Sequence, residues 1–176
     1  MATYEFTLTF WLPDKDAEPE AYLDALFDAG CDDATIGVGR HGVISLAFNR
    51  EAPAAEEAIR SAVAVVTQAI PGSRLVEAKP DLVNLSDIAD LVGVSRQNIR
   101  KYAAGEIRSV DERFPVPSFS GSPTPLWHLY EVALWLSRYT DLRPSPEIIE
   151  ASLAAYKLNI DTERWRIDTL DKVGTD

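Results

Sequence analysis

The stretch LSDIADLVGVSRQNIRKYAAGE, residues 85–106, predicts two short helices joined by a tight turn. Ser86 is placed to cap a first helix over residues 87–91, and Ser95 to cap a second, because a serine at the N-cap accepts a hydrogen bond from a first-turn amide. Gly93 supplies the turn, since glycine adopts a positive φ without steric penalty. This spacing is typical of a helix-turn-helix unit.

The apolar and small side chains of the stretch are spaced to close the two helices against each other. They are Ile88, Ala89, Val92, Val94, Ile99 and Tyr102. With these side chains inward, the second helix presents a polar face that carries Arg96, Gln97, Arg100 and Lys101. Arginine donates two hydrogen bonds to guanine, and glutamine pairs with adenine, in the major groove of DNA. We therefore expect Arg96, Gln97 and Arg100 to contact bases.

Other polar side chains of the region are suited to the DNA backbone. The helix N-terminus at Ser95 can bind a phosphate through its amides and hydroxyl. Lys101, Arg108 and Arg113 supply further cations for phosphate contacts. Residues 95–113 carry five basic and three acidic side chains. The alternative is that these cations form a solvated face without a ligand.

A resemblance to known families adds to this interpretation. The segment GVSRQNIRKY resembles the recognition helix of the MerR and excisionase-like (AlpA-like) winged helix-turn-helix families. The likeness covers residues 82–139 and includes FPVP at 114–117, PLW at 125–127 and Trp135. It implies that the FP-x-P segment and the LW segment are the strands of a wing, with a short helix packed beneath.

The same resemblance suggests two further features of the wing. His128 stands where such proteins often carry Arg, and it is a candidate contact to the DNA backbone or a plain surface residue. The wing tip, Ser120-Gly121-Ser122-Pro123-Thr124, is small and polar, which suits either a loop along phosphates or a simple turn. Trp127 and Trp135 each belong to a set of regularly spaced apolar residues and are expected in the core.

The function that the resemblance implies is sequence-specific binding of double-stranded DNA by a bacterial or phage transcriptional regulator. MerR-like proteins dimerise through a C-terminal helix, and a two-fold dimer matches a palindromic site. One alternative is an excisionase-like architectural factor. Another is an antitoxin or adaptor-type module, in which an acidic N-terminal domain binds a basic protein partner.

Residues 1–80 predict a separate α+β domain. Aromatic and aliphatic residues alternate with polar ones from Tyr4 to Leu12, which is typical of a strand with one buried face. A helix is expected over residues 19–29 and another over 54–70, with strands at 34–38, 43–48 and 74–78. The order β-α-β-β-α-β indicates a ferredoxin-like fold that dimerises or regulates.

No residue set in the sequence predicts catalysis or a bound cofactor. The segment 37–42 matches G-x-G-x-x-G, but a strand and not a helix follows it, so the glycines are expected to serve a turn. The paired acids Asp32 and Asp33, like Glu56 and Glu57, lack a neighbouring base or nucleophile. Cys31 is the single cysteine, and it is expected to be buried. We expect neither an enzyme nor a metal site.

The net charge of −11 is unevenly distributed. Residues 1–80 carry −7, residues 81–140 carry −1 and residues 141–176 carry −3. Salt screens charges over about 8 Å, so a local basic face can act beside a distant acidic one. The acidic body is then expected to suppress nonspecific DNA binding.

The two ends of the chain complete the predicted organisation. The start, MATYEFTLTF, has no basic region before an apolar one, and the chain has no apolar run of about 18 residues, so we expect a cytoplasmic protein without a membrane partner. After a winged helix-turn-helix over residues 81–140, residues 141–176 form a helical tail that starts at Ser145-Pro146-Glu147.

The tail has an apolar stripe of its own. Ile149, Leu153, Tyr156 and Ile160 recur at helical spacing, and Trp165 and Leu170 continue the stripe. This helix is expected either to cover the winged domain or to pair with its copy. The ferredoxin-like domain is the other candidate surface for a homodimer, and the sequence leaves the choice between them open.

Overall fold

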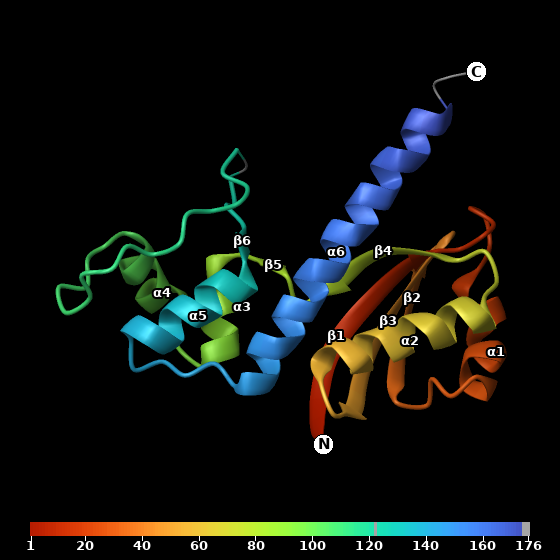
Figure 1. Ribbon diagram of the computed structural model, residues 1–176, viewed down its shortest axis with the longest axis horizontal. Coiled ribbons are helices and arrows are strands. Elements are labelled where there is room, and N and C mark those ends of the chain that lie inside the picture. Colours follow the sequence, from red (N-terminus) through yellow and green to blue (C-terminus); the bar gives the residue numbers. More distant parts are fainter. Residues whose placement is uncertain (122, 174–176) are drawn as a thin grey trace.

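The structure is a computed structural model that describes residues 1–121 and 123–173. In this part of the chain the fold is α+β, with one four-stranded antiparallel sheet and six α-helices. Two separate hydrophobic cores are present, a sheet core and a helical core. Figure 1 shows the long helix α6 (Pro146–Val173) running between them. Ser122 of the expected wing tip lies outside the described residues.

The sheet is built from β1 (Ala2–Trp11), β2 (Ala34–Arg40), β3 (Val43–Ala52) and β4 (Arg74–Lys79). Their spatial order is β2-β3-β1-β4, and every neighbouring pair is antiparallel. The alternation in β1 sends one side chain in two into the core. Phe6 lies opposite Phe48 of β3, and their rings stack with centroids 5.2 Å apart.

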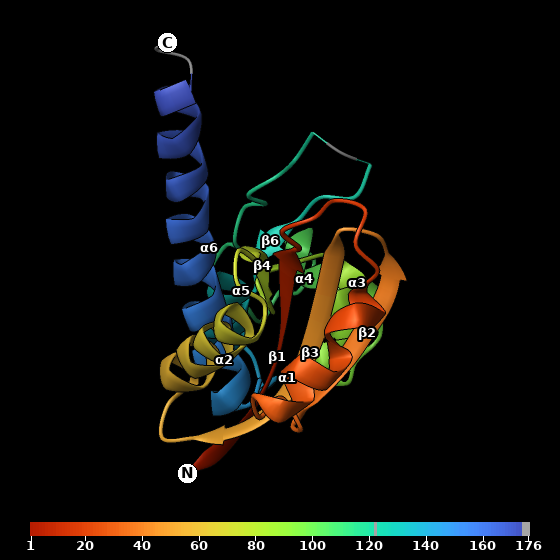
Figure 2. The same ribbon diagram turned by 90° about the vertical axis from the view of Figure 1, so that its right-hand side faces the viewer.

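Helices cover a single face of this sheet. The 3₁₀ turn η1 (Pro19–Tyr22), the short helix α1 (Leu23–Asp28) and α2 (Ala55–Ala69) all contribute to the sheet core. The expected helix at 19–29 is thus divided into a 3₁₀ turn and an α-helical turn. Cys31 follows α1 and is buried, as expected, and burial raises the pKa of its thiol. Figure 2 shows α1 in front of the strands and α2 to one side of them, next to α6.

The glycine segment 37–42 forms a strand and a turn, as expected. Residues through Arg40 belong to β2, and β3 starts at Val43. Gly42 has φ +72, and a Cβ atom there would collide with the backbone carbonyl of Lys15. The glycine is therefore required by a close backbone approach, and no helix N-terminus follows that could hold a phosphate.

The helical core combines β5 (Leu82–Val83), α3 (Leu85–Val92), α4 (Arg96–Ala103), β6 (Trp127–His128) and α5 (Leu129–Tyr139). Strand β5 pairs with β6, so the start and the end of this region are joined. Trp127 and Trp135 are both core residues, as expected. The Phe114 ring lies between them, with edge-on contacts to each.

The N-cap of α3 is not the residue expected from the sequence. Asn84, and not Ser86, is the N-cap: its side-chain oxygen accepts hydrogen bonds from the amides of Ser86 and Asp87 at 2.7 and 3.1 Å. The Asp87 carboxylate in turn accepts a hydrogen bond from the Asn84 amide at 2.9 Å, which completes a capping box. Ser86 lies two residues too late to cap, because the helix already begins at Leu85.

The expected FP-x-P wing strand is also corrected. Residues 114–117 form no strand, and it is Phe119 that pairs with Leu126 in a single antiparallel bridge. Two backbone hydrogen bonds of 3.2 and 3.0 Å join these two residues. Residues 114–117 are held instead by side chains: Phe114 is buried, and the Trp127 Nε1 donates to the Pro115 carbonyl at 2.9 Å.

Helix α6 begins where expected, with the Ile148 amide donating to the Ser145 hydroxyl at 3.2 Å. Its most buried face consists of small residues, Ala151, Ala154 and Ala155, which belong to the sheet core. The stripe of larger residues expected from the sequence lies on other sides of the helix. The alanines let α6 approach the sheet closely, so α6 is part of the same helix layer as α2.

Candidate nucleic-acid interface

The orientation of α4 is determined by its two ends and its buried face. Gly93 has a left-handed conformation with φ 71, which ends α3 and redirects the chain. The Ser95 hydroxyl then accepts a hydrogen bond from the Asn98 amide at 3.2 Å, as expected for the cap of α4. Ile99 is completely buried against the helical core, and Tyr102 contacts the edge of Trp135. These contacts turn the opposite face of α4 to solvent.

The outward face of α4 carries four exposed polar side chains, Arg96, Gln97, Arg100 and Lys101. They lie on one side of the helix because they follow the spacing i, i+1, i+4, i+5. Within residues 1–121 and 123–173, none of their three cations forms an ion pair or a side-chain hydrogen bond. Their donors are therefore free for a ligand.

The loop that leaves α4 continues this basic surface. Arg108 and Arg113 are exposed, and neither has an ion-pair partner among the described residues. The loop is held at both ends: the Glu106 amide donates to the Lys101 carbonyl at 2.9 Å at its start, and the Phe114 side chain is buried at its end. The structure thus places the side chains expected from 96 to 113 on one helix and its adjoining loop.

His128 occupies a different environment from the α4 residues. Its Nδ1 lies 2.7 Å from an Asp81 carboxylate oxygen, and its ring stacks on Tyr156 of α6 with centroids 3.7 Å apart. The His128 side chain is 16% exposed. Strand β6, which carries it, pairs with β5 and lies between α4 and α6 in the view of Figure 1.

A polar junction around Asp81 joins the two cores, and no pattern in the sequence predicted it. Asp81 is 4% exposed, and it accepts a hydrogen bond from the Asn159 side-chain nitrogen at 2.7 Å in addition to its contact with His128. The Asn159 amide also bonds both backbone groups of Ala78 on β4, at 2.8 and 2.9 Å. Because Asp81, His128 and Asn159 are far apart in the chain, no local pattern predicted that they meet, and His128 was considered only as a DNA contact or a surface residue.

Charge is separated in space as well as in sequence. The acidic segment 1–80 forms the sheet, and α4 lies at the opposite end of the molecule (Figure 1). Electrostatic interactions between exposed charges fade beyond about 8 Å in physiological salt. The acidic sheet therefore does not cancel the local basic surface of α4 and its loop.

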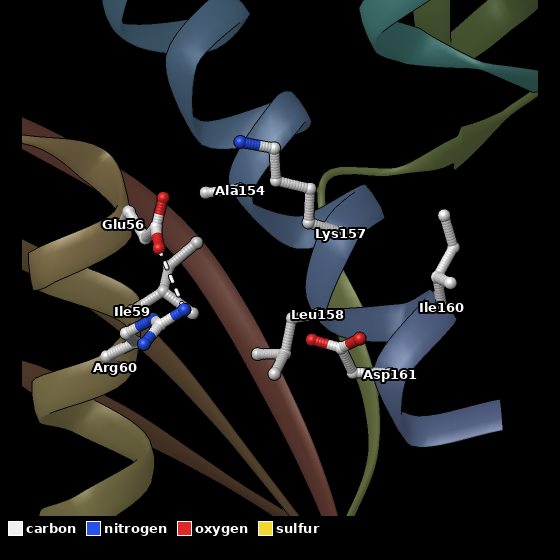
Figure 3. A pocket seen from close by; sticks show the side chains of 8 residues that line it. All are labelled: Glu56, Ile59, Arg60, Ala154, Lys157, Leu158, Ile160 and Asp161. Carbon is white, nitrogen blue, oxygen red and sulfur yellow. Dashed lines mark ion pairs between the residues drawn. The ribbon is translucent and has the colours of Figure 1, made fainter. Parts of the chain in front are cut away.

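Two of the acidic side chains singled out in the sequence, Glu56 and Asp33, form ion pairs. A groove of about 580 Å³ runs between α2 and α6, where Glu56 and Arg60 of α2 form an ion pair beside Ile59, and Leu158 of α6 lies on the opposite side (Figure 3). Asp33, one of the paired acids of the sequence, is bound to Arg50 by two hydrogen bonds of 2.6 and 2.9 Å. The carboxylates of Glu56 and Asp33 thus each form an ion pair with an arginine. Among the described residues, no three metal-binding side chains cluster.

Comparison of the chain with models of protein families, with curated proteins and with solved structures finds no match. In the described part of the chain, none of the helices combines the length and the apolar character needed to cross a bilayer.

Proposed function

We propose that this chain is a sequence-specific double-stranded DNA-binding protein, acting in the cytoplasm as a transcriptional regulator and homodimer. The observation that carries the proposal is the outward face of α4. It has exposed donors without protein partners, a buried Ile99 behind them, and a position remote from the acidic sheet. An exposed helix of this kind fits the major groove of B-DNA.

In this proposal α4 is the recognition helix. Arg96, Gln97 and Arg100 contact base edges, since they lie in its first turns, where recognition helices approach bases. Lys101 and the amides at Ser95 bind phosphates, as do Arg108 and Arg113 on the adjoining loop. His128 was a candidate contact to the DNA backbone, but its contacts with Asp81 and Tyr156 favour a role in positioning β6.

The architecture supports the two domain types expected from the sequence. The element order β-α-β-β-α-β with the sheet order β2-β3-β1-β4 supports a ferredoxin-like domain in residues 1–80. The pairing of β5 with β6 and the Phe119–Leu126 bridge support a short wing after the helix-turn-helix.

The direct test is selection of bound duplexes from a random pool, followed by sequencing. Wild type is compared with Arg96→Ala/Arg100→Ala and with Lys15→Ala/Arg40→Ala, which removes the same charge from exposed sites on the sheet side. We expect one motif, recovered by wild type and by the control but not by the α4 variant. No enrichment with wild type at low salt would refute the proposal and favour a basic protein partner of the acidic domain.

A bend in the selected DNA distinguishes an architectural factor from a regulator.

Each mismatched base pair costs about 1–3 kcal/mol in a specific complex, so loss of two base-reading arginines should lower affinity at least tenfold. An equal loss on random DNA would show that α4 binds only phosphates.

A further inference from the structure

A second groove, which we call the junction groove, lies where the two cores meet, beside Asp81. Its volume is about 780 Å³, and small-molecule sites typically measure about 300–1,000 Å³. Strands β4, β5 and β6 and helix α6 come together there (Figure 1), and all four line the groove with Phe119 of the bridge. Small-molecule sites occur preferentially at the boundary between two structural units. The junction groove therefore has the size and the position of such a site.

The walls of the junction groove are largely apolar. Two isoleucines of α6, Ile160 and Ile167, are 45% and 58% exposed, and Phe119 is 56% exposed. Three partly buried side chains continue the apolar lining, namely Val76, Leu82 and Tyr156. A molecule that occupies the groove removes this surface from water, which favours its binding.

One polar atom of the lining has no partner in the protein. Asp81 is 4% exposed, and its carboxylate, which only accepts hydrogen bonds when ionised, lies 2.7 Å from Nδ1 of His128. The proton of the neutral ring is therefore on Nδ1, and Nε2 is an acceptor. Within residues 1–121 and 123–173, no hydrogen bond or ion pair engages Nε2. Because Nδ1 faces Asp81 and Tyr156 covers one ring face, the edge with Nε2 is left for the groove.

The charged side chains around the junction groove are mostly acidic. Glu77, Glu163 and Asp168 line it together with Asp81, and among the described residues of the lining Arg164 is the only arginine or lysine. The field of these carboxylates opposes the entry of an anion. A ligand of this groove therefore carries no negative charge.

We propose that the junction groove binds a small organic molecule with an apolar body, no negative charge, and a hydroxyl or N–H group that donates to Nε2 of His128. The apolar body lies against the isoleucines of α6. The donor extends a chain of hydrogen bonds from the ligand through the His128 ring to Asp81. An imidazole suits this place because it bonds at both nitrogens. The site goes beyond the proposed DNA binding and is independent of it, so it is tested on the free protein.

The first test observes the ring nitrogens by NMR of protein labelled with ¹⁵N-histidine. The chain has two histidines, so His41→Gln leaves a single pair of signals and assigns His128. In mildly alkaline buffer we expect Nε2 of His128 to have the shift of an unprotonated nitrogen, and the addition of 2-naphthalenemethanol to move it. A proton on Nε2 in the free protein would overturn the proposal, because the acceptor would be missing.

Related probes isolate the donor and the charge of the ligand. The methyl ether of 2-naphthalenemethanol has the same rings without the hydroxyl hydrogen, and it should bind about fivefold more weakly, which is the effect of one hydrogen bond. The anion 2-naphthoate should bind more weakly still, and Asp168→Asn should improve its binding. Equal affinities for the alcohol and the ether would overturn the assigned acceptor, and an anion that binds as well as the alcohol would overturn the charge argument.

Two variants of α6 locate the site. Ile160→Asp places a charge in the wall of the junction groove and should weaken binding of the alcohol by about tenfold or more. Leu170→Asp is the matched control, since it makes the same kind of change at a more exposed position, 72%, outside the lining, and it should bind like wild type. Circular dichroism verifies that both variants are folded. Unchanged binding by Ile160→Asp, or no shift of His128 at the solubility limit of the alcohol, would overturn the site.

Discussion

The junction at Asp81 should be one of the most sensitive positions of the molecule. Asp81→Ala removes two short hydrogen bonds, from His128 and from Asn159, each 2.7 Å long. A hydrogen bond to a charged group contributes about 1.5–3 kcal/mol. The gain from no longer burying the carboxylate offsets part of this loss. We expect the free energy of unfolding to fall by about 3 kcal/mol.

Chemical denaturation followed by tryptophan fluorescence measures this change. Trp127 and Trp135 report on the helical core, and Trp11 and Trp165 on the sheet side. Asp81→Asn keeps an acceptor oxygen and should cost less than Asp81→Ala. Asp90→Ala, an exposed acid on α3, is the control and should change stability by less than about 0.5 kcal/mol. An Asp81→Ala protein as stable as this control would refute the argument that the junction joins the two cores.

Three further predictions test individual parts of the structure. Asn84→Ala should lower the free energy of unfolding by about 1 kcal/mol, because Asn84 caps α3. Ser86→Ala should lower it by much less. Equal effects of the two substitutions in chemical denaturation would contradict the assigned cap. The Tyr4 hydroxyl donates to Glu150 on α6, which raises the pKa of Tyr4 from 10.0 to about 12. The contribution of this hydrogen bond to the free energy of unfolding should therefore be fully present below pH 10 and be lost as the pH rises toward 12. A plot of the free energy of unfolding against pH should be flatter over this range in Tyr4→Phe. Lys101→Ala should weaken binding to all duplexes alike and reduce the salt slope of log K by about 0.9 per monomer, as measured by titration at several salt concentrations.

Local patterns predicted much of the fold because their causes are local. Alternation between Tyr4 and Leu12 indicated a strand with one buried face, and every second side chain is indeed in the core. The glycine at 93 and the serine at 95 act on neighbouring backbone groups only. Their turn and cap were therefore predicted correctly, and so was the burial of Ile99.

Several features depended on tertiary contacts. Both Asn84 and Ser86 are good cap residues, and the choice between them depends on where β5 ends and α3 begins. The strand at residues 114–117 was expected from the resemblance alone; the prolines at 115 and 117 have no N–H to donate to a sheet, and the Trp127 indole binds the Pro115 carbonyl instead. A strand needs a partner, which the sequence of the segment alone does not specify.

The sequence by itself determined the position and type of most elements: the four sheet strands, helices from caps and periodic apolar residues, and an outward basic face on α4. Only the tertiary structure decided which face of α6 is buried. Its alanines permit close approach to the sheet, so the larger residues stay outside, although hydrophobicity alone favours the reverse. Likewise, only the folded chain brings Asp81, His128 and Asn159 together, because a buried charge acquires its hydrogen-bond partners from segments that are distant in sequence.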